Sequence, residues 1–184
     1  MTGMADAELM GLAAKGSEIA FAEIVRRYQD VLLNFFLRSA VSFVDGQDLA
    51  QRTFLRLWRY RRKYRPEGAK FTTFLFMLAR QESIDFFRAE ARRREREDAL
   101  MAAAAEQASA AKGGAAATAA GEAVRRAVGR LTPTLRDAVE LVVFQDLPYA
   151  EAGEILGVPL GTVKSRIFNA LKKLKEYLDD ERGH

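Results

Sequence analysis

Cysteine is absent from this 184-residue sequence, and its only histidine is the last residue, His184. These two absences exclude disulfides and thiolate nucleophiles, and they leave too few ligands for a structural zinc site. Residues 11–17 read GLAAKGS, which lacks the residue order of a phosphate-binding loop. We therefore expect no metal, no cofactor, no small-molecule substrate and no enzymatic activity. A hydrolase or transferase activity of the pure protein would overturn this expectation.

Long apolar runs and a strong net charge are also missing. The most apolar stretch, residues 139–144, is far shorter than the ~18 to 20 apolar residues of a membrane span. The first ten residues carry Asp6 and Glu8 and no basic leader. We expect a cytoplasmic protein with no membrane insertion. The net charge of +4 indicates a nucleic-acid partner only if the positive residues are clustered.

Alanine is abundant at one place in the chain. Of the 25 residues from 99 to 123, 14 are alanine, and Gly113 and Gly114 lie in the middle. The segment has no aromatic side chain to anchor a core, although alanine allows parts of it to be helical. The sequence therefore predicts an N-terminal domain over residues 1–97, a flexible linker over 98–121 and a C-terminal domain over 122–184.

Apolar residues recur at helical spacing on both sides of this linker, which predicts an all-α chain of two small helical domains. The first N-terminal helix is expected after Ser17, a second after Asp45 as its N-cap, and a third from Thr72 into the basic run 88–96. The stripe of the first helix is Phe21, Ile24, Val25, Tyr28, Leu32, Phe35 and Phe36.

The C-terminal domain has the pattern of a helix-turn-helix. Thr132 and Pro133 mark a helix start, because proline at the first helical position loses no hydrogen bond. A short helix over residues 148–156, a turn over 157–159 and a long helix over 162–178 follow.

The positive charge is clustered despite the small net value. Residues 1–96 contain 18 basic and 12 acidic residues, and residues 97–184 contain 11 and 13. Residues 52–65 carry seven basic side chains and no acid, interleaved with Trp58, Tyr60 and Tyr64. Phosphates accept such charge and unstacked bases stack on such rings, so this run suits nucleic acid. A solvated helix face with one core tryptophan is an equally good interpretation of the run alone.

Charge is also segregated within the C-terminal domain. Its supporting helices are acidic, whereas its last helix is basic before Glu176. The N-terminal half of that helix offers side chains that donate to phosphates and base edges in a major groove, although a basic helix that merely closes the domain is the alternative. The acids are Asp137, Glu140, Asp146, Glu151 and Glu154; the bases are Lys164, Arg166, Lys172, Lys173 and Lys175.

Four sequence blocks, in order, resemble bacterial sigma factors of the extracytoplasmic-function (ECF) group of the sigma-70 family, the small kind with regions 2 and 4 only. The first three are FAEIVRRYQDVLLNFFLR, DGQDLAQRTFLRLWR and FTTFLFMLARQESIDFFRAEARRR, which resemble region 2. The fourth is LTPTLRDAVELVVFQDLPYAEAGEILGVPLGTVKSRIFNALKKL, which resembles the helix-turn-helix of region 4. The resemblance implies a protein that binds core RNA polymerase and directs promoter-specific transcription initiation, under control of an anti-sigma factor.

The resemblance also assigns three sets of candidate residues. Contact with polymerase is implied for Asp48, Gln51, Leu55 and Trp58, with Leu49 and Phe54 as core residues of the same pattern. Contact with −10 promoter DNA is implied for Arg59, Tyr64, Arg65, Lys70, Arg80, Arg88, Arg92 and Arg93. Contact with −35 promoter DNA is implied for Thr162, Lys164, Ser165, Arg166, Asn169 and Lys172.

Two alternatives and several departures remain open. The loop over residues 64–70 suits capture of an extruded base, but an ordinary surface loop is nearly as good an interpretation. A helix-turn-helix regulator that binds DNA without polymerase would explain the C-terminal domain alone. Relatives commonly carry an acid where Arg52 stands, a serine where Pro148 stands and an alanine where Gly153 stands, and we expect Gly153 to permit a close approach of two helices.

Overall fold

The computed structural model describes residues 3–39, 41–68, 70–104 and 119–182, and within these ranges it contains helices and no strand. The all-α prediction is confirmed. None of the described helices is long and apolar enough to cross a membrane. The helices are α1 (Asp6–Ala14), α2 (Glu18–Arg38), α3 (Phe43–Tyr60), α4 (Phe71–Ala104), α5 (Ala119–Arg130), α6 (Pro133–Val139), the π-helix η1 (Glu140–Phe144), α7 (Tyr149–Leu156) and α8 (Leu160–Arg182).

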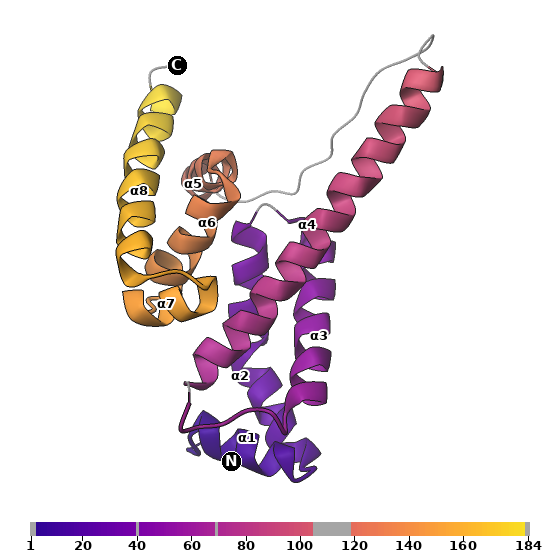
Figure 1. Cartoon of the computed structure of the whole chain (residues 1–184), viewed down its shortest axis with the longest axis vertical. Coiled ribbons are helices and arrows are strands. Elements are labelled where there is room, and N and C mark those ends of the chain that lie inside the picture. Colours follow the sequence, from indigo (N-terminus) through magenta and orange to yellow (C-terminus); the bar gives the residue numbers. More distant parts are fainter. Residues whose placement is uncertain (1–2, 40, 69, 105–118, 183–184) are drawn as a thin grey trace.

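Helices α1 to α4 form the N-terminal bundle, in which α2 packs against α1 and α3, and α3 packs against α4 (Figure 1). Ser17 is the N-cap of α2 as predicted, and its side chain accepts a hydrogen bond from the Ala20 N–H. The N-cap of α3 is Ser42, not Asp45, because the Ser42 hydroxyl accepts from the Asp45 N–H. Fully buried side chains of the bundle are Leu9, Met10, Ile24, Leu32, Phe36, Leu49, Leu57 and Leu75.

Helix α1 was not predicted from the sequence, and polar contacts fix it to α2. The Tyr28 hydroxyl donates to Asp6 at 2.6 Å, and the Arg27 guanidinium donates to the other Asp6 oxygen at 2.8 Å. Burial and the neighbouring Asp6 carboxylate raise the pKa of Tyr28 well above its usual value. Because Leu9 and Met10 are fully buried, α1 completes the core of this bundle.

Helices α5 to α8 form the C-terminal domain. Pro133 begins α6 as predicted, with Thr132 at the N-cap position but without a side-chain cap bond. Arg136 on α6 donates to the carbonyl oxygens of Val128, Gly129 and Leu131. These carbonyls lie at the end of α5, where a helix leaves acceptors unpaired. Arg136 therefore joins α5 to α6. Helix α5 was not predicted, and neither was the π-helical form of η1, although the helix expected from Pro133 extends to Val142.

Helix α7, the turn and α8 form the predicted helix-turn-helix. Gly157 ends α7 in the left-handed conformation with φ of 66°, which favours glycine. The Val158 N–H donates to the Gly153 carbonyl and the Gly157 N–H to the Glu154 carbonyl, so the two bonds complete the helix end. A Cβ at Gly153 would lie 2.9 Å from the Val158 carbonyl oxygen. The close approach expected at Gly153 is thus made to the turn backbone.

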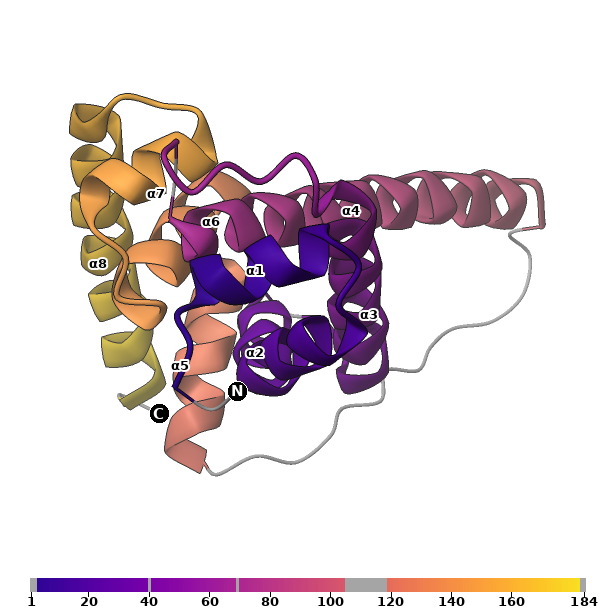
Figure 2. The ribbon, with the colours of Figure 1, turned by 90° about the horizontal axis from the view of Figure 1, so that it is seen from below.

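The two domains meet along the N-terminal half of α4. Helix α7 packs against that half, and α5 contacts α2. The C-terminal half of α4 extends away from the C-terminal domain in both views (Figures 1 and 2). Helix α4 continues to Ala104, beyond the predicted domain boundary at residue 97, and α5 begins before residue 122. Most of the predicted linker, residues 105–118, lies outside the described residues, and the predicted domain boundaries stay predictions.

Candidate polymerase and nucleic-acid interfaces

The residues predicted to contact polymerase lie along one side of α3. Their spacing of three or four residues places them on one helical face. Asp48 and Gln51 are exposed, and 59% of Leu55 is accessible to solvent. Asp48 forms an ion pair with Arg52 at 2.6 Å. The arginine that replaces an acid common in relatives therefore partly neutralises this face, while Leu49 and Phe54 are buried as expected.

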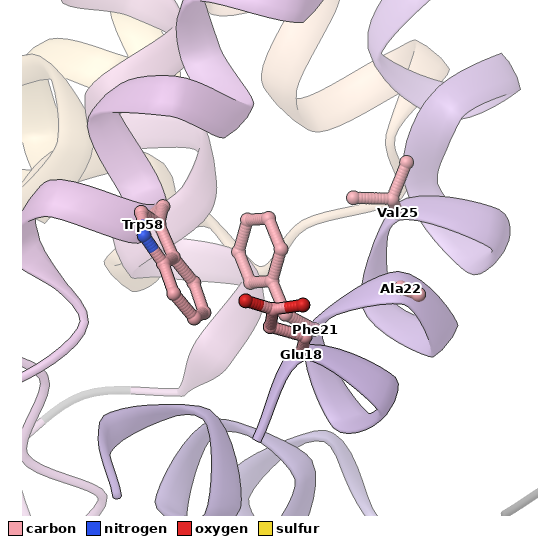
Figure 3. Close-up of a pocket in the computed structure, with 5 residues that line it drawn as sticks. All are labelled: Glu18, Phe21, Ala22, Val25 and Trp58. Atoms are coloured by element: carbon pink, nitrogen blue, oxygen red, sulfur yellow. The ribbon is translucent and has the colours of Figure 1, made fainter. Parts of the chain in front are cut away.

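Trp58 lies at the edge of an apolar groove of about 410 Å³ between α2 and α3. Its ring contacts the Phe21 ring with centroids 4.9 Å apart (Figure 3). The Arg61 guanidinium lies 3.9 Å from the centroid of the Trp58 ring. Ala22 and Val25 of α2 complete the apolar wall. Sequence reasoning missed this groove, because Phe21 and Trp58 lie far apart in the chain and only the packing of α2 on α3 brings them together.

The basic run over residues 52–65 divides into structural and exposed side chains. Arg56 pairs with Glu82 at 2.8 Å and with Asp85 at 3.5 Å, and both partners lie on α4. Arg61 donates to the Ala13 and Trp58 carbonyl oxygens. Arg59 is exposed. Arg56 and Arg61 thus hold the bundle together, and a nucleic-acid role for the exposed side chains of this run stays a prediction.

Tyr64 does not have the exposed ring that base stacking requires. Only 8% of it is accessible, and its ring packs against Phe71 and Phe74 with centroid distances of 6.1 and 5.5 Å. Burial raises the pKa of its hydroxyl. The prediction that Tyr64 contacts −10 DNA does not fit this structure, because the ring belongs to the core. Arg65 is exposed and donates to the carbonyl oxygens of Arg62 and Tyr64.

The remaining −10 candidates lie in two groups at α4. Lys70 and Arg80, at its N-terminal half, are paired with carboxylates of the C-terminal domain: Lys70 with Glu151, and Arg80 with Asp137 at 3.2 Å. Arg88, Arg92 and Arg93 are exposed on the half that extends away from that domain, and Arg93 also pairs with Glu90 at 2.9 Å. The structure therefore separates these candidates into a group that is paired with carboxylates of the C-terminal domain and a group on the part of α4 that extends away from it.

The −35 candidates lie on the N-terminal half of α8. The side of α8 that packs inward carries Val163, Ile167 and Ala170, which are buried. Ser165 donates to the Thr162 carbonyl at 2.9 Å. Burial raises the pKa of Asp137, and Arg166 is among the neighbouring cations that oppose this rise. Thr162 and Arg166 are partly exposed, and Lys164, Ser165, Asn169 and Lys172 are exposed.

Three acids of the supporting helices, Asp137, Glu140 and Glu151, have partners that the sequence did not reveal. Glu140 is buried, accepts from Gln145 at 2.9 Å and from Arg38 of α2 at 3.4 Å, and has a second oxygen without a hydrogen bond. Burial raises the pKa of Glu140 to about 7 despite these donors. In the sequence, the clustering of these acids on α6, η1 and α7, apart from the candidate DNA-binding residues of α8, was a signal of a packing role.

No group of three or more residues that could hold a metal occurs in the part of the chain that the structure describes.

The two family profiles that match the chain are Sigma-70 region 2, over residues 24–93, and Sigma-70, region 4, over residues 121–174. The ECF RNA polymerase sigma factor RpoE of Cereibacter sphaeroides is 30% identical over 161 residues, which are 88% of this chain and 87% of that relative. The chain belongs to the ECF sigma factor family.

Two solved structures share the fold of this ECF sigma factor. CnrH in complex with the cytosolic domain of CnrY is 23% identical, with a TM-score of 0.71 over 96% of this chain and 99% of that chain. The sigma factor RpoE from Bartonella quintana, in complex with the anti-sigma factor NepR, is also 23% identical, with a TM-score of 0.67 over 86% of this chain and 96% of that chain.

The two matched regions contain all the candidate residues. Region 2 extends from α2 to the basic part of α4, and region 4 extends from the start of α5 into α8. Helix α1 precedes the matched part of region 2, although its buried side chains belong to the same core. We refer below to α1–α4 as the region 2 domain and to α5–α8 as the region 4 domain.

Proposed function

We propose that this ECF sigma factor directs core RNA polymerase to specific promoters through three separate surfaces. The exposed face of α3 binds polymerase, the loop before α4 together with α4 binds −10 DNA, and the N-terminal half of α8 reads −35 DNA. The observation that carries the proposal is the chemical difference between these surfaces. The α3 face offers a carboxylate, an amide and an apolar side chain, whereas α4 and α8 offer cations. Cations are the groups that phosphates recruit.

Arg166 is the strongest candidate for reading a base in the −35 element. Its planar fork can donate to O6 and N7 of guanine together, and it lies in the first two turns of the second helix of the helix-turn-helix, where such contacts are made. Lys164 and Lys172, both exposed, more simply neutralise phosphate. Phe168 is 71% exposed on the same helix and offers an apolar contact to a thymine methyl group.

Run-off transcription with core polymerase on genomic fragments tests the proposal as a whole and supplies the promoter. Arg166→Ala should then weaken binding to that promoter by about 5- to 100-fold, the cost of a lost bidentate contact, and leave co-elution with core polymerase unchanged. Lys175→Ala is the matched control, because it removes one exposed positive charge from the distal part of α8. Equal losses in the two variants would contradict the assignment.

The proposed polymerase-binding face of α3 is tested by a double variant that should lose polymerase binding and keep DNA binding. Asp48→Ala with Gln51→Ala should abolish co-elution with core polymerase at micromolar concentrations and leave binding of −35 DNA unchanged. Gln29→Ala with Asp30→Ala is the matched control, since it removes an exposed amide and carboxylate from α2. Failure of the unmodified chain to co-elute, together with specific binding of a palindromic site, would favour the alternative of a polymerase-independent regulator.

An anti-sigma partner is the second part of the proposal. It is supported by relatives of the same fold, one of which was solved in complex with an anti-sigma factor. A protein that forms a 1:1 complex with this chain, and lowers its run-off transcription in proportion, is the expected partner. A chain purified from its own cells without such a partner and with undiminished activity would count against it.

A further inference from the structure

Helix α1 lies before the matched part of region 2, which begins at residue 24, and none of the candidate residues lies on it. The loop that follows α3, over residues 61–68, passes beside α1 in both views (Figures 1 and 2). This loop belongs to the surface proposed for −10 DNA. Any contact between α1 and the loop therefore acts on that surface.

Arg61, the first residue of the loop, ties the loop to the end of α1. Its guanidinium donates to the Ala13 carbonyl at 3.1 Å and to the Trp58 carbonyl at 2.6 Å. Carbonyl groups in the last turn of a helix have no partner within the helix and carry partial negative charge, so a cation is stabilised there. Arg61 thus joins the end of α3 to the end of α1 and fixes where the loop begins.

A second connection runs from α1 to the loop through aromatic rings. Asp6 accepts from the Tyr28 hydroxyl at 2.6 Å, and the Tyr28 ring meets the edge of the Phe71 ring with centroids 5.1 Å apart. Phe71 in turn packs against the Tyr64 ring with centroids 6.1 Å apart, and Tyr64 is the buried residue in the middle of the loop. Asp6 is therefore linked to the loop by three rings in succession.

The backbone hydrogen bonds described within the loop are local. The N–H groups of Lys63 and Gly68 donate to carbonyl oxygens three residues earlier, at 2.7 and 3.0 Å. Arg65 donates to the Tyr64 carbonyl at 3.2 Å, so the direction of its guanidinium follows the loop backbone. Local bonds alone leave a surface loop free to open, whereas buried contacts hold it. Arg61 and Tyr64 are thus the anchors that hold this loop on the bundle.

We propose that α1 holds the loop over residues 61–68 in the conformation that binds −10 DNA, with Asp6 as a positioning residue that acts through Tyr28 and Phe71. The proposal rests on the proposed function, because it requires the loop to contact −10 DNA. A loop that is ordered before binding avoids the entropy cost of becoming ordered on the DNA. Loss of the Asp6 contacts should therefore loosen the loop and weaken −10 binding.

The sign of the effect distinguishes positioning from simple electrostatics. Removing the negative charge of Asp6 would by electrostatics alone strengthen DNA binding or leave it unchanged, because DNA is an anion. Positioning predicts the opposite result, a weaker −10 complex. Tyr28→Phe removes the other side of the same hydrogen bond, changes no charge and keeps the ring of the core. Asp6→Asn and Tyr28→Phe should therefore have the same effect.

Glu8→Gln is the matched control for Asp6→Asn, because it also removes one negative charge from α1. Glu8 is exposed, and its carboxylate accepts from the Ala5 N–H at 2.8 Å, which the oxygen of a glutamine can also do. Because the chain has no cysteine, Glu67→Cys gives a unique dye site on an exposed residue of the loop. Fluorescence anisotropy of that dye reports how freely the loop moves.

The test uses holoenzyme assembled from core polymerase and each variant, and the DNA probe is the −10 strand of a promoter found by run-off transcription. We expect Asp6→Asn and Tyr28→Phe to lower the dye anisotropy and, without the dye, to bind this strand about three- to tenfold more weakly. The double variant should lose no more than the larger single effect, because both changes break one contact. Glu8→Gln should match the unmodified chain, and urea unfolding verifies that each variant is folded.

Failure of this proposal and failure of the proposed function give different results. If the unmodified chain does not prefer the −10 strand over a scrambled strand, the proposed function fails, while the anisotropy still reports whether α1 orders the loop. If Asp6→Asn and Tyr28→Phe unfold at lower urea concentration but keep the anisotropy and the −10 affinity, α1 only stabilises the bundle and the positioning role is overturned. An equal loss of −10 affinity in Glu8→Gln also overturns it.

Discussion

Gly153 is the residue on which the geometry of the helix-turn-helix depends most directly. A methyl group there would lie 2.9 Å from the Val158 carbonyl oxygen, which is backbone and cannot turn aside. Gly153→Ala should therefore destabilise the region 4 domain by ~1 to 3 kcal/mol through overpacking, against a helix-propensity gain of ~1 kcal/mol. The thermal unfolding midpoint measures the balance, and we expect it to fall.

Gly161→Ala is the control for that substitution, because a Cβ at Gly161 would meet nothing within 4 Å in the first turn of α8. No steric contact opposes the gain in helix propensity of Gly161→Ala, so the thermal unfolding midpoint of this variant should rise. Equal shifts in the two variants would show that the contact with Val158 carries no cost. An alanine at position 153 would then fit here too.

Tyr64 gives the second prediction for a single residue. Since its ring packs between Phe71 and Phe74, Tyr64→Ala should cost ~3 to 5 kcal/mol of stability, as for other large-to-small core changes. Tyr64→Phe keeps the ring and should retain both the unfolding midpoint and the affinity for −10 DNA. A selective loss of −10 binding in Tyr64→Phe, at unchanged stability, would restore a direct DNA contact by its hydroxyl.

At the scale of elements, the segment α6–η1 buries a carboxyl that titrates near neutrality. Glu140 is 2% exposed, and burial raises its pKa from 4.5 to about 7, while Gln145 and Arg38 act in the opposite direction and Asp137 adds to the rise. The folded state therefore binds a proton more tightly than the unfolded state. Between pH 4.5 and 7 the contribution of Glu140 to stability falls as pH rises, and it reaches its lowest value above pH 7.

The comparison of Glu140→Gln with the unmodified chain should reveal this titration. The amide keeps an acceptor for Gln145 and Arg38 but carries no charge. The free energy of unfolding of the variant should therefore increase relative to that of the unmodified chain as pH rises from 5 to 8, by roughly 3 kcal/mol at most. Urea unfolding at a series of pH values measures the difference. Glu154→Gln, at an exposed position, should keep the pH dependence of the unmodified chain. If the unfolding free energies of Glu140→Gln and the unmodified chain differ by the same amount at every pH, Glu140 is not the group that titrates.

Elements that local chemistry determines were predictable, and elements that depend on distant packing were not. Ser17, Pro133 and Gly157 mark their helix ends within a few residues, and each acts as the sequence indicates. Helix α1 is fixed by Asp6 contacts with α2, and α5 by Arg136 on the next helix, so neither has a complete local signal. The burial of the Tyr64 ring could not be predicted for the same reason, because its neighbours Phe71 and Phe74 come from the next helix.

At the scale of the whole molecule, the small net charge is the sum of two surfaces of opposite sign. The candidate DNA-binding residues were assigned by the resemblance to sigma factors, and cations cluster on the helices that carry many of them. Their pairing with acids could not be predicted, because the partners of Lys70 and Arg80 lie 81 and 57 residues away in the chain. The sequence therefore predicts which side chains suit DNA, while only the three-dimensional arrangement reveals which of them are paired.

Charge pairs that are partly exposed weaken with salt, and this gives the last prediction. Raising salt from about 0.05 to 0.5 M shortens the screening length from ~14 to ~4 Å, so the domains of the unmodified chain should separate and its radius of gyration in small-angle X-ray scattering should increase. The increase should be smaller in Glu151→Gln with Asp137→Asn, which removes the carboxylates of two of these pairs, and unchanged in Glu154→Gln with Asp146→Asn, which removes two exposed carboxylates outside them. A radius that is independent of salt in all three proteins would mean that the packing around Arg38 and Phe144, and not the charge pairs, holds the domains together.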